Sequence, residues 1–110
     1  MNDIHETDYE KIYHRAIEAY GEDMQVNIAI EEMAELIKAI IKYKRYVAGR
    51  CSVQQQEYIQ FTKDAGIAEE IADVRIMLDQ LELIFCVKNE VDEIIHQKMD
   101  RLEKRLESGI

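Results

Sequence analysis

The sequence predicts an all-α fold of four to five helices that form an antiparallel bundle, completed by oligomerisation. The 110 residues include no proline and only four glycines, whereas the many reversals of a β-sandwich or barrel need such residues. Apolar residues instead recur every three to four positions over long segments, which is typical of amphipathic helices. This length indicates one domain. We therefore expect residues 1–110 to be a single all-α domain, and helical chains this short often complete their core in an oligomer.

The N-terminal half is predicted to contain two helices. After a short polar lead-in over residues 1–6, apolar residues at helical spacing predict a first helix over about 7–20. Gly21 follows it as a terminating residue. A longer helix is predicted over about 23–47, with the Asp23 side chain as a candidate cap for its first turn.

The C-terminal half begins with a variable connection over residues 48–64. Within this connection, capping-box spacing makes 52–62 either a short helix or an ordered loop. Gly66 then precedes a strongly apolar segment that predicts a helix over about 67–87. A final amphipathic helix is predicted over about 90–107.

Charge and composition exclude several classes of partner. The chain has 23 acidic and 14 basic side chains, a net charge of −9, whereas proteins that bind nucleic-acid backbones need clustered lysine and arginine. We found no secretory-signal pattern and no run of about 18 apolar residues, so we expect no membrane contact and a cytoplasmic location. Cys51 and Cys86 belong to no metal or disulfide motif and are expected to be simple thiols.

Paired carboxylates in two of the predicted helices carry the main functional signal. Glu32 and Glu35 lie three residues apart in one helix, and Glu70 and Asp73 lie three apart in the other. This spacing places each pair on one helix face, where like charges repel unless a cation lies between them. Four converging carboxylates would form an oxygen-rich site that suits a hard cation such as Mg²⁺ or Mn²⁺.

The helical wheel places the two pairs differently. Glu70 interrupts the apolar stripe of its helix and Asp73 lies at the edge of that stripe, a costly position for a carboxylate unless it is paired, protonated or bound to metal. Glu32 and Glu35 lie off the apolar face of their own helix, where a solvated acidic face is the alternative interpretation. The apolar positions are Ala29, Ile30, Met33, Leu36, Ile37, Ile40 and Ile41 in the first helix, and Ile67, Ile71, Val74, Met77, Leu78, Leu81 and Phe85 in the second.

These motifs resemble those of the MazG-like all-α nucleoside triphosphate pyrophosphohydrolase superfamily. Residues 30–36 resemble the first acidic motif of the family and residues 69–74 the second. Lys98-Met99-Asp100 and Arg105 resemble its Lys/Arg motif, and the similarity covers about 20–109 without the connection. The resemblance implies a hydrolase of phosphoric anhydrides that converts (deoxy)nucleoside triphosphates to monophosphate and pyrophosphate in nucleotide-pool housekeeping. It also implies a homodimer or a dimer-of-dimers tetramer whose chains enclose the nucleotide together.

The resemblance further implies roles for the acidic residues. Glu32, Glu35, Glu70 and Asp73 would bind Mg²⁺, for which Mn²⁺ is a possible substitute. Glu31 matches a glutamate that ligates the metal or orients a water molecule in some members. The base for the attacking water is therefore Glu31 or Glu35, and the sequence does not choose between them.

The sequence gives weaker signals for the residues that would contact the phosphates and the base of a nucleotide. Cationic side chains are needed against the charge that develops on pyrophosphate. Lys98 lies near the centre of the apolar stripe of the last helix, with Arg101 and Arg105 on its flank; the alternatives are a snorkelling lysine and ordinary surface charge. The candidate base contacts, which could equally be core, capping or surface groups, are Tyr20, Gln25 and Asn27.

Two other classes of function remain open. A carboxylate di-iron bundle needs two Glu-x-x-His motifs, and the chain has one, Glu93-Ile94-Ile95-His96, with no second. A non-enzymatic helical oligomerisation or interaction module, an inactive relative of the same family, is the other alternative. The intact acidic motif argues against inactivity.

Overall fold

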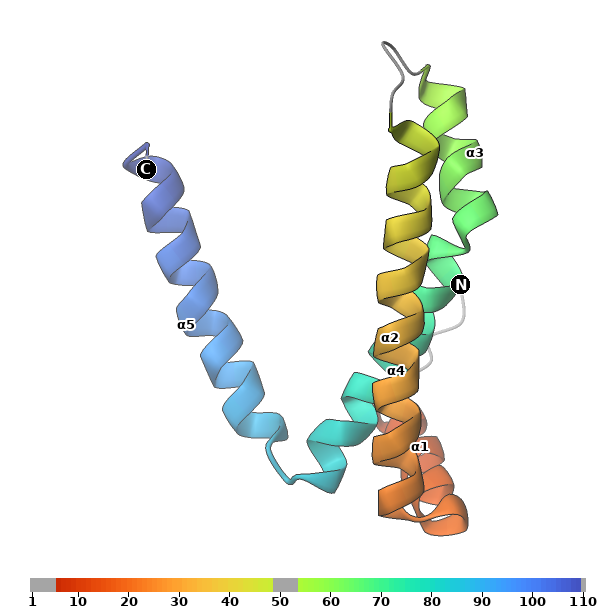
Figure 1. The fold of residues 1–110 in the computed structure, drawn as a ribbon. Coiled ribbons are helices and arrows are strands. Elements are labelled where there is room, and N and C mark those ends of the chain that lie inside the picture. Colours follow the sequence, from red (N-terminus) through yellow and green to blue (C-terminus); the bar gives the residue numbers. More distant parts are fainter. Residues whose placement is uncertain (1–5, 49–53, 110) are drawn as a thin grey trace.

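The computed structural model describes residues 6–48 and 54–109, and these residues form five α-helices (Figure 1). The all-α prediction is confirmed for this part of the chain. Residues 1–5 of the predicted lead-in lie outside the described residues, and Glu6 already belongs to the first helix. The helices are α1 (Glu6–Tyr20), α2 (Glu22–Val47), α3 (Gln55–Ala65), α4 (Ile67–Ile84) and α5 (Lys88–Glu107).

The start of α2 differs from the prediction. Gly21 is the N-cap residue, with φ at 90°, and no side chain caps the helix. Asp23 lies inside the first turn together with Glu22, so the prediction that Asp23 caps α2 was wrong. Both carboxylates still stabilise this end of the helix, because negative charge is favourable near a helix N-terminus.

The connection between α2 and α4 contains a helix, α3, in place of a loop. The ring centroids of Phe61 on α3 and Tyr46 on α2 lie 5.5 Å apart in a tilted arrangement, which joins the two helices. Gly66 then ends α3 in the left-handed region, with φ at 71°, and serves as the N-cap residue of α4. The chain bends at this glycine, and α4 continues in roughly the direction of α3, so that both run opposite to α2 (Figure 1).

The end of α4 comes three residues earlier than predicted. Cys86 adopts φ of 57°, its backbone N–H donates to the carbonyl of Leu83, and the N–H of Val87 donates to the carbonyl of Glu82. These two bonds are the Schellman pattern that closes helices, usually at a glycine. The sequence has no glycine here, which is why the turn was predicted a few residues too late, between 87 and 90, where α5 has already begun. The Cys86 thiol is free and exposed, as expected, while Cys51 lies outside the described residues.

The most extensive helix pairing is between α2 and α4, which run antiparallel (Figure 1). The buried apolar residues at the centre are Ala29 and Ala39 of α2 and Val74 and Met77 of α4. Small alanine side chains allow the helices to approach closely. As a result, α2 packs through the face that carries its alanines and Glu32, and the isoleucines that we predicted to form its core face are exposed.

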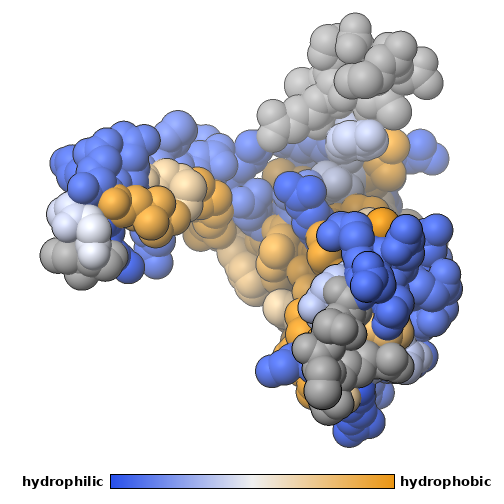
Figure 2. All heavy atoms as spheres, turned by 90° about the horizontal axis from the view of Figure 1, so that it is seen from above, coloured by the Kyte–Doolittle hydropathy of each residue, from blue (hydrophilic) through white to orange (hydrophobic). Residues whose placement is uncertain are grey.

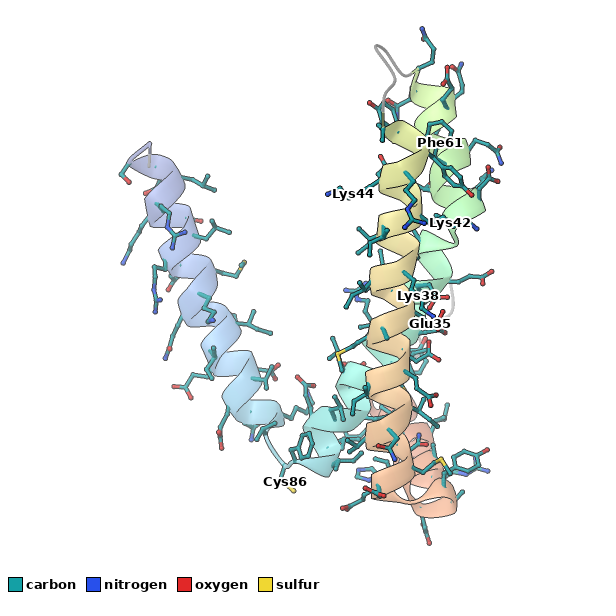
Figure 3. All side chains as sticks on the ribbon, viewed as in Figure 1. Glu35, Lys38, Lys42, Lys44, Phe61 and Cys86 are labelled. Atoms are coloured by element: carbon teal, nitrogen blue, oxygen red, sulfur yellow. The ribbon has the colours of Figure 1, made fainter. Side chains whose placement is uncertain are left out.

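Helix α5 leaves the other helices. Among the described helices it contacts α4 alone, and it diverges to form a V whose base is the turn at Cys86 (Figures 1 and 3). No residue along α5, all of which is described, is buried. The radius of gyration is 17.9 Å, whereas a compact chain of this length has about 13 Å. We call this helix the α5 arm. Among the helices described, none has the length and apolarity needed to cross a membrane.

Candidate metal centre

Three of the four predicted ligands converge where α2 and α4 pack together. Glu32 comes from α2, and Glu70 and Asp73 come from successive turns of α4. One carboxylate oxygen from each residue lies within 4.8 Å of the other two. The three carboxylates meet because α2 and α4 pack side by side with the acidic residues 31–35 of α2 opposite the acidic residues 69–73 of α4.

Glu70 carries the clearest sign of an unmet interaction. Its Oε2 atom is buried and has no hydrogen-bond partner in the structure. A buried polar atom without a partner costs about 1–3 kcal/mol, more if it is charged. A cation beside this oxygen would remove the cost, and so would a proton.

The pKa of Glu32 is raised by burial and by the carboxylates around it. Desolvation raises the pKa of its carboxyl above the usual value. The neighbouring charges of Asp73, Glu70 and Glu35 raise it further, and so does a hydrogen bond with Asp73. Without a cation, this cluster therefore favours holding a proton at Glu32.

The remaining acidic candidates lie around the cluster. Glu35 is exposed and lies outside the group of three, and its Oε1 atom pairs with the Nζ atom of Lys38 at 3.5 Å on the same helix (Figure 3). Glu31 is also exposed. Both are on α2 within one turn of Glu32, which leaves them available to a molecule bound next to the cluster.

A small hollow adjoins the carboxylates. It is lined by Glu32 and Asp73 together with the apolar side chains of Ile28, Ile76 and Met77, and its volume is about 100 Å³. Sites for drug-sized ligands have volumes of roughly 300–1,000 Å³. The hollow therefore has room for an ion and its waters, and a nucleotide would extend beyond it.

The candidate base contacts are not brought together. Tyr20 and Asn27 are exposed, whereas Gln25 is buried between α2 and α4. The Nε2 atom of Gln25 donates to Oε1 of Gln80 at 2.7 Å. Gln80 was not predicted, although it lies seven residues after Asp73 and therefore on the same face of α4. This spacing is the signal that could have found it.

The candidate phosphate contacts all lie on the α5 arm. Lys98, Arg101 and Arg105 are exposed, and the arm makes no contact with α2 among the described residues. A single chain therefore does not bring these cations to the carboxylates. His96 is likewise exposed on the arm.

The donor set fits a hard cation. All three ligands offer carboxylate oxygens, the donors that magnesium and manganese prefer. In the described part of the chain, no other group of three or more acidic, histidine or cysteine side chains is placed to hold a metal, and this group contains no histidine. Comparison with protein-family models, with curated proteins and with solved structures finds no match for this chain.

Proposed function

We propose that this protein is a Mg²⁺-dependent nucleoside triphosphate pyrophosphohydrolase that yields nucleoside monophosphate and pyrophosphate. The observation that carries the proposal is the convergence of Glu32, Glu70 and Asp73 within 4.8 Å. They come from two separate acidic motifs, on a face where carboxylates are costly without a cation. Nucleotide-pool housekeeping is the role that this activity would serve.

The ligand set divides into an inner and an outer part. Glu32, Glu70 and Asp73 would hold the ion, and Glu35 would join them by leaving Lys38. A divalent ion held there would neutralise phosphate oxygens and lower the pKa of a bound water. Mn²⁺ would substitute, because it accepts the same oxygen donors.

The chain's own groups would supply the remaining steps. Glu31 or Glu35 would accept the proton of the water that attacks the triphosphate. Lys98 and Arg105, with Arg101 beside them, would stabilise the charge that develops on the pyrophosphate leaving group. Because the α5 arm holds these cations away from the carboxylates of its own chain, they would come from another chain of a homodimer or of a dimer-of-dimers tetramer.

The test is a panel of canonical and modified (deoxy)nucleoside triphosphates with Mg²⁺, in which monophosphate and diphosphate products are separated. We expect monophosphate and pyrophosphate. A diphosphate product with orthophosphate would contradict the proposed reaction.

A matched pair of variants separates site chemistry from general charge. Glu70→Gln removes the charge at the buried oxygen, and Glu69→Gln makes the same change one residue away at an exposed position. We expect Glu70→Gln to lose Mg²⁺ binding in isothermal titration and to lose turnover, while Glu69→Gln keeps both. Equal behaviour of the two variants would contradict the site.

The non-enzymatic interaction module is the second candidate, favoured by the many apolar side chains that the single chain exposes. Absence of Mg²⁺ binding by the wild-type protein, with no turnover on any nucleotide, would support it. The di-iron alternative would require bound iron, which elemental analysis of the purified protein measures directly.

A further inference from the structure

The geometry points to a reciprocal assembly in which a second copy of this chain occupies the V between α4 and the α5 arm. We propose that the α5 arm of each copy lies in the V of the other, antiparallel to the arm that it contacts. The proposal concerns assembly alone and holds whether or not the chain hydrolyses nucleotides. It specifies the surface and orientation through which copies meet.

The first observation is a pair of exposed apolar stripes on the packed helices. On α2 four exposed isoleucines follow one side of the helix. Along α4 three exposed apolar residues recur every seven positions and follow one side, while Met24 and Ile76 are exposed elsewhere on the two helices. The residues of the two stripes are Ile30, Ile37, Ile40 and Ile41 on α2, and Ile71, Leu78 and Phe85 on α4.

The two stripes point to the same side of the molecule. Each stripe is offset by roughly 100–120° from the face through which its helix packs, counted at about 100° per residue. Because α2 and α4 run antiparallel, offsets in the same rotational sense turn both stripes to one side of the pair. Together they form one apolar surface, which we call the α2–α4 apolar face.

The α5 arm adds a third stripe beside this face. Val91 lies at the start of the arm, and the exposed side chains of Ile94, Ile95, Met99, Leu102 and Leu106 continue the stripe to its end. The groove between α4 and the arm has a volume of about 580 Å³ and is floored by apolar residues that include Leu78 and Phe85. Hydrophobic residues gather in the angle between the arm and the other helices (Figure 2).

The exposed area is large enough for an extensive interface with a second copy. The chain exposes 9006 Å², whereas a folded protein of 13.0 kDa exposes about 6,300 Å². The excess of about 2,700 Å² far exceeds the roughly 800 Å² per partner that a stable interface of standard size buries. An obligate assembly of identical chains, whose interfaces resemble a protein core cut in half, accounts for this excess.

Charge complementarity favours an antiparallel direction for the second arm. The arm is acidic at its N-terminal end and basic at its C-terminal end, and α2 has the same polarity, with Glu22 and Asp23 first and Lys44 and Arg45 last. A second arm that runs antiparallel to the first arm and to α2 sets basic ends against acidic ends along these two helices. The charged positions on the arm are Lys88, Glu90, Asp92 and Glu93 in its first half, which is net acidic, and Lys98, Asp100, Arg101, Glu103, Lys104, Arg105 and Glu107 in its second half, which is net basic.

The first experiment measures mass in solution by analytical ultracentrifugation. Ile37→Glu places a charge on the α2–α4 apolar face, and Ile12→Glu is its control on α1, because the two isoleucines are 58% and 56% exposed. We expect Ile37→Glu to halve the wild-type mass at micromolar concentration and Ile12→Glu to leave it unchanged.

A second variant, on the α5 arm, separates loss of assembly from misfolding of the chain. Leu102 lies on the arm and is not buried within its own chain, so Leu102→Glu should keep the helical circular dichroism signal and still halve the mass. A wild-type protein that remains at 13.0 kDa would overturn the proposal. So would equal dissociation by Ile12→Glu. Mg²⁺ binding measured on the same samples keeps a failure of the assembly distinct from a failure of the proposed function.

The second experiment tests the orientation with engineered cysteines, in a background where Cys51 and Cys86 are serine. Copies with Val91→Cys are mixed with copies with Leu106→Cys and oxidised. Antiparallel arms place the start of one arm near the end of the other, so the expected product is the mixed disulfide in large excess. Predominant linkage of Leu106→Cys copies to one another would indicate parallel arms and overturn the proposed orientation.

Discussion

The α2–α4 pair and the α5 arm are built from similar amphipathic sequence, yet the single chain packs only the first. The α2–α4 interface buries Ala29, Ala39, Val74 and Met77, together with the amide pair of Gln25 and Gln80. No residue of the α5 arm is buried. An apolar stripe therefore specifies a contact without specifying which chain supplies the other half.

The largest expected effect is on the acidic cluster within the packed pair. Asp73→Asn should lower kcat at least about 10³-fold, because a metal ion contributes several kcal/mol of charge stabilisation in the transition state. The helical circular dichroism signal should stay largely unchanged, because Asp73 is exposed. Steady-state kinetics with Mg²⁺ measures the effect, and Asp23→Asn on the first turn of α2 is the control. Loss of the fold in Asp73→Asn would make this residue structural.

The next prediction compares the two regions by methionine truncation. Met77 is 6% exposed and Met99 on the arm is 54% exposed. Met77→Ala should lower the free energy of unfolding by about 2–5 kcal/mol, the range for buried methionine. Met99→Ala should act mainly on assembly, so its effect should depend on protein concentration. Urea unfolding at several concentrations measures both, and equal effects at high dilution would contradict the comparison.

The third prediction concerns pH and metal. The pKa of Glu32 is raised in the folded state. The stability that the protonated form contributes is therefore complete below the ordinary pKa of the unfolded chain and is lost as pH rises through the folded value. In metal-free protein this contribution should fall between acidic and neutral pH. Glu32→Gln should remove that fall and raise the Tm of the metal-free protein at neutral pH.

Mg²⁺ should restore the stability that the metal-free protein loses when Glu32 ionises. At about 100 times its dissociation constant it should stabilise the wild-type protein by about 2.7 kcal/mol, measured as a rise in Tm at neutral pH. Glu32→Gln should not respond, while Glu18→Gln, an exposed position on α1, should respond like the wild type. An equal response of all three proteins would place the ion elsewhere.

The smallest expected effect is at the contact between α1 and α4. The hydroxyl of Tyr13 donates to Oδ2 of Asp79 at 3.1 Å. Burial and this acceptor raise the Tyr13 pKa to about 12. The corresponding stability is complete below the ordinary pKa near 10 and is lost as pH rises through about 12. Tyr13→Phe should cost about 0.5–1.5 kcal/mol and remove the last tyrosinate step in an absorbance titration.

The sequence by itself predicted the all-α class and most helix boundaries. Helical periodicity, the absence of proline, and Gly21 and Gly66 as terminators are local signals, because a helix satisfies its backbone hydrogen bonds within its own segment. The turn at Cys86 was predicted a few residues too late because a residue other than glycine holds the left-handed conformation there. The acidic spacing also indicated which carboxylates to examine, and three of the four now lie together.

Val74 and Met77 of the predicted apolar stripe of α4 are buried as expected, and only the tertiary structure decided which face of α2 is buried. The isoleucine-rich face of α2 was the natural prediction for its core. Of that face only Ala29 is buried, and α2 packs through Ala29, Ala39 and Glu32. Small side chains let two helices approach closely, and a hydrophobic stripe is equally satisfied by a second chain. Whether a side chain is buried depends on the whole fold, because its apolar surface leaves water only where the fold places another surface against it. The same arrangement decided that Glu70 meets Glu32 and that the cations of α5 lie apart from them.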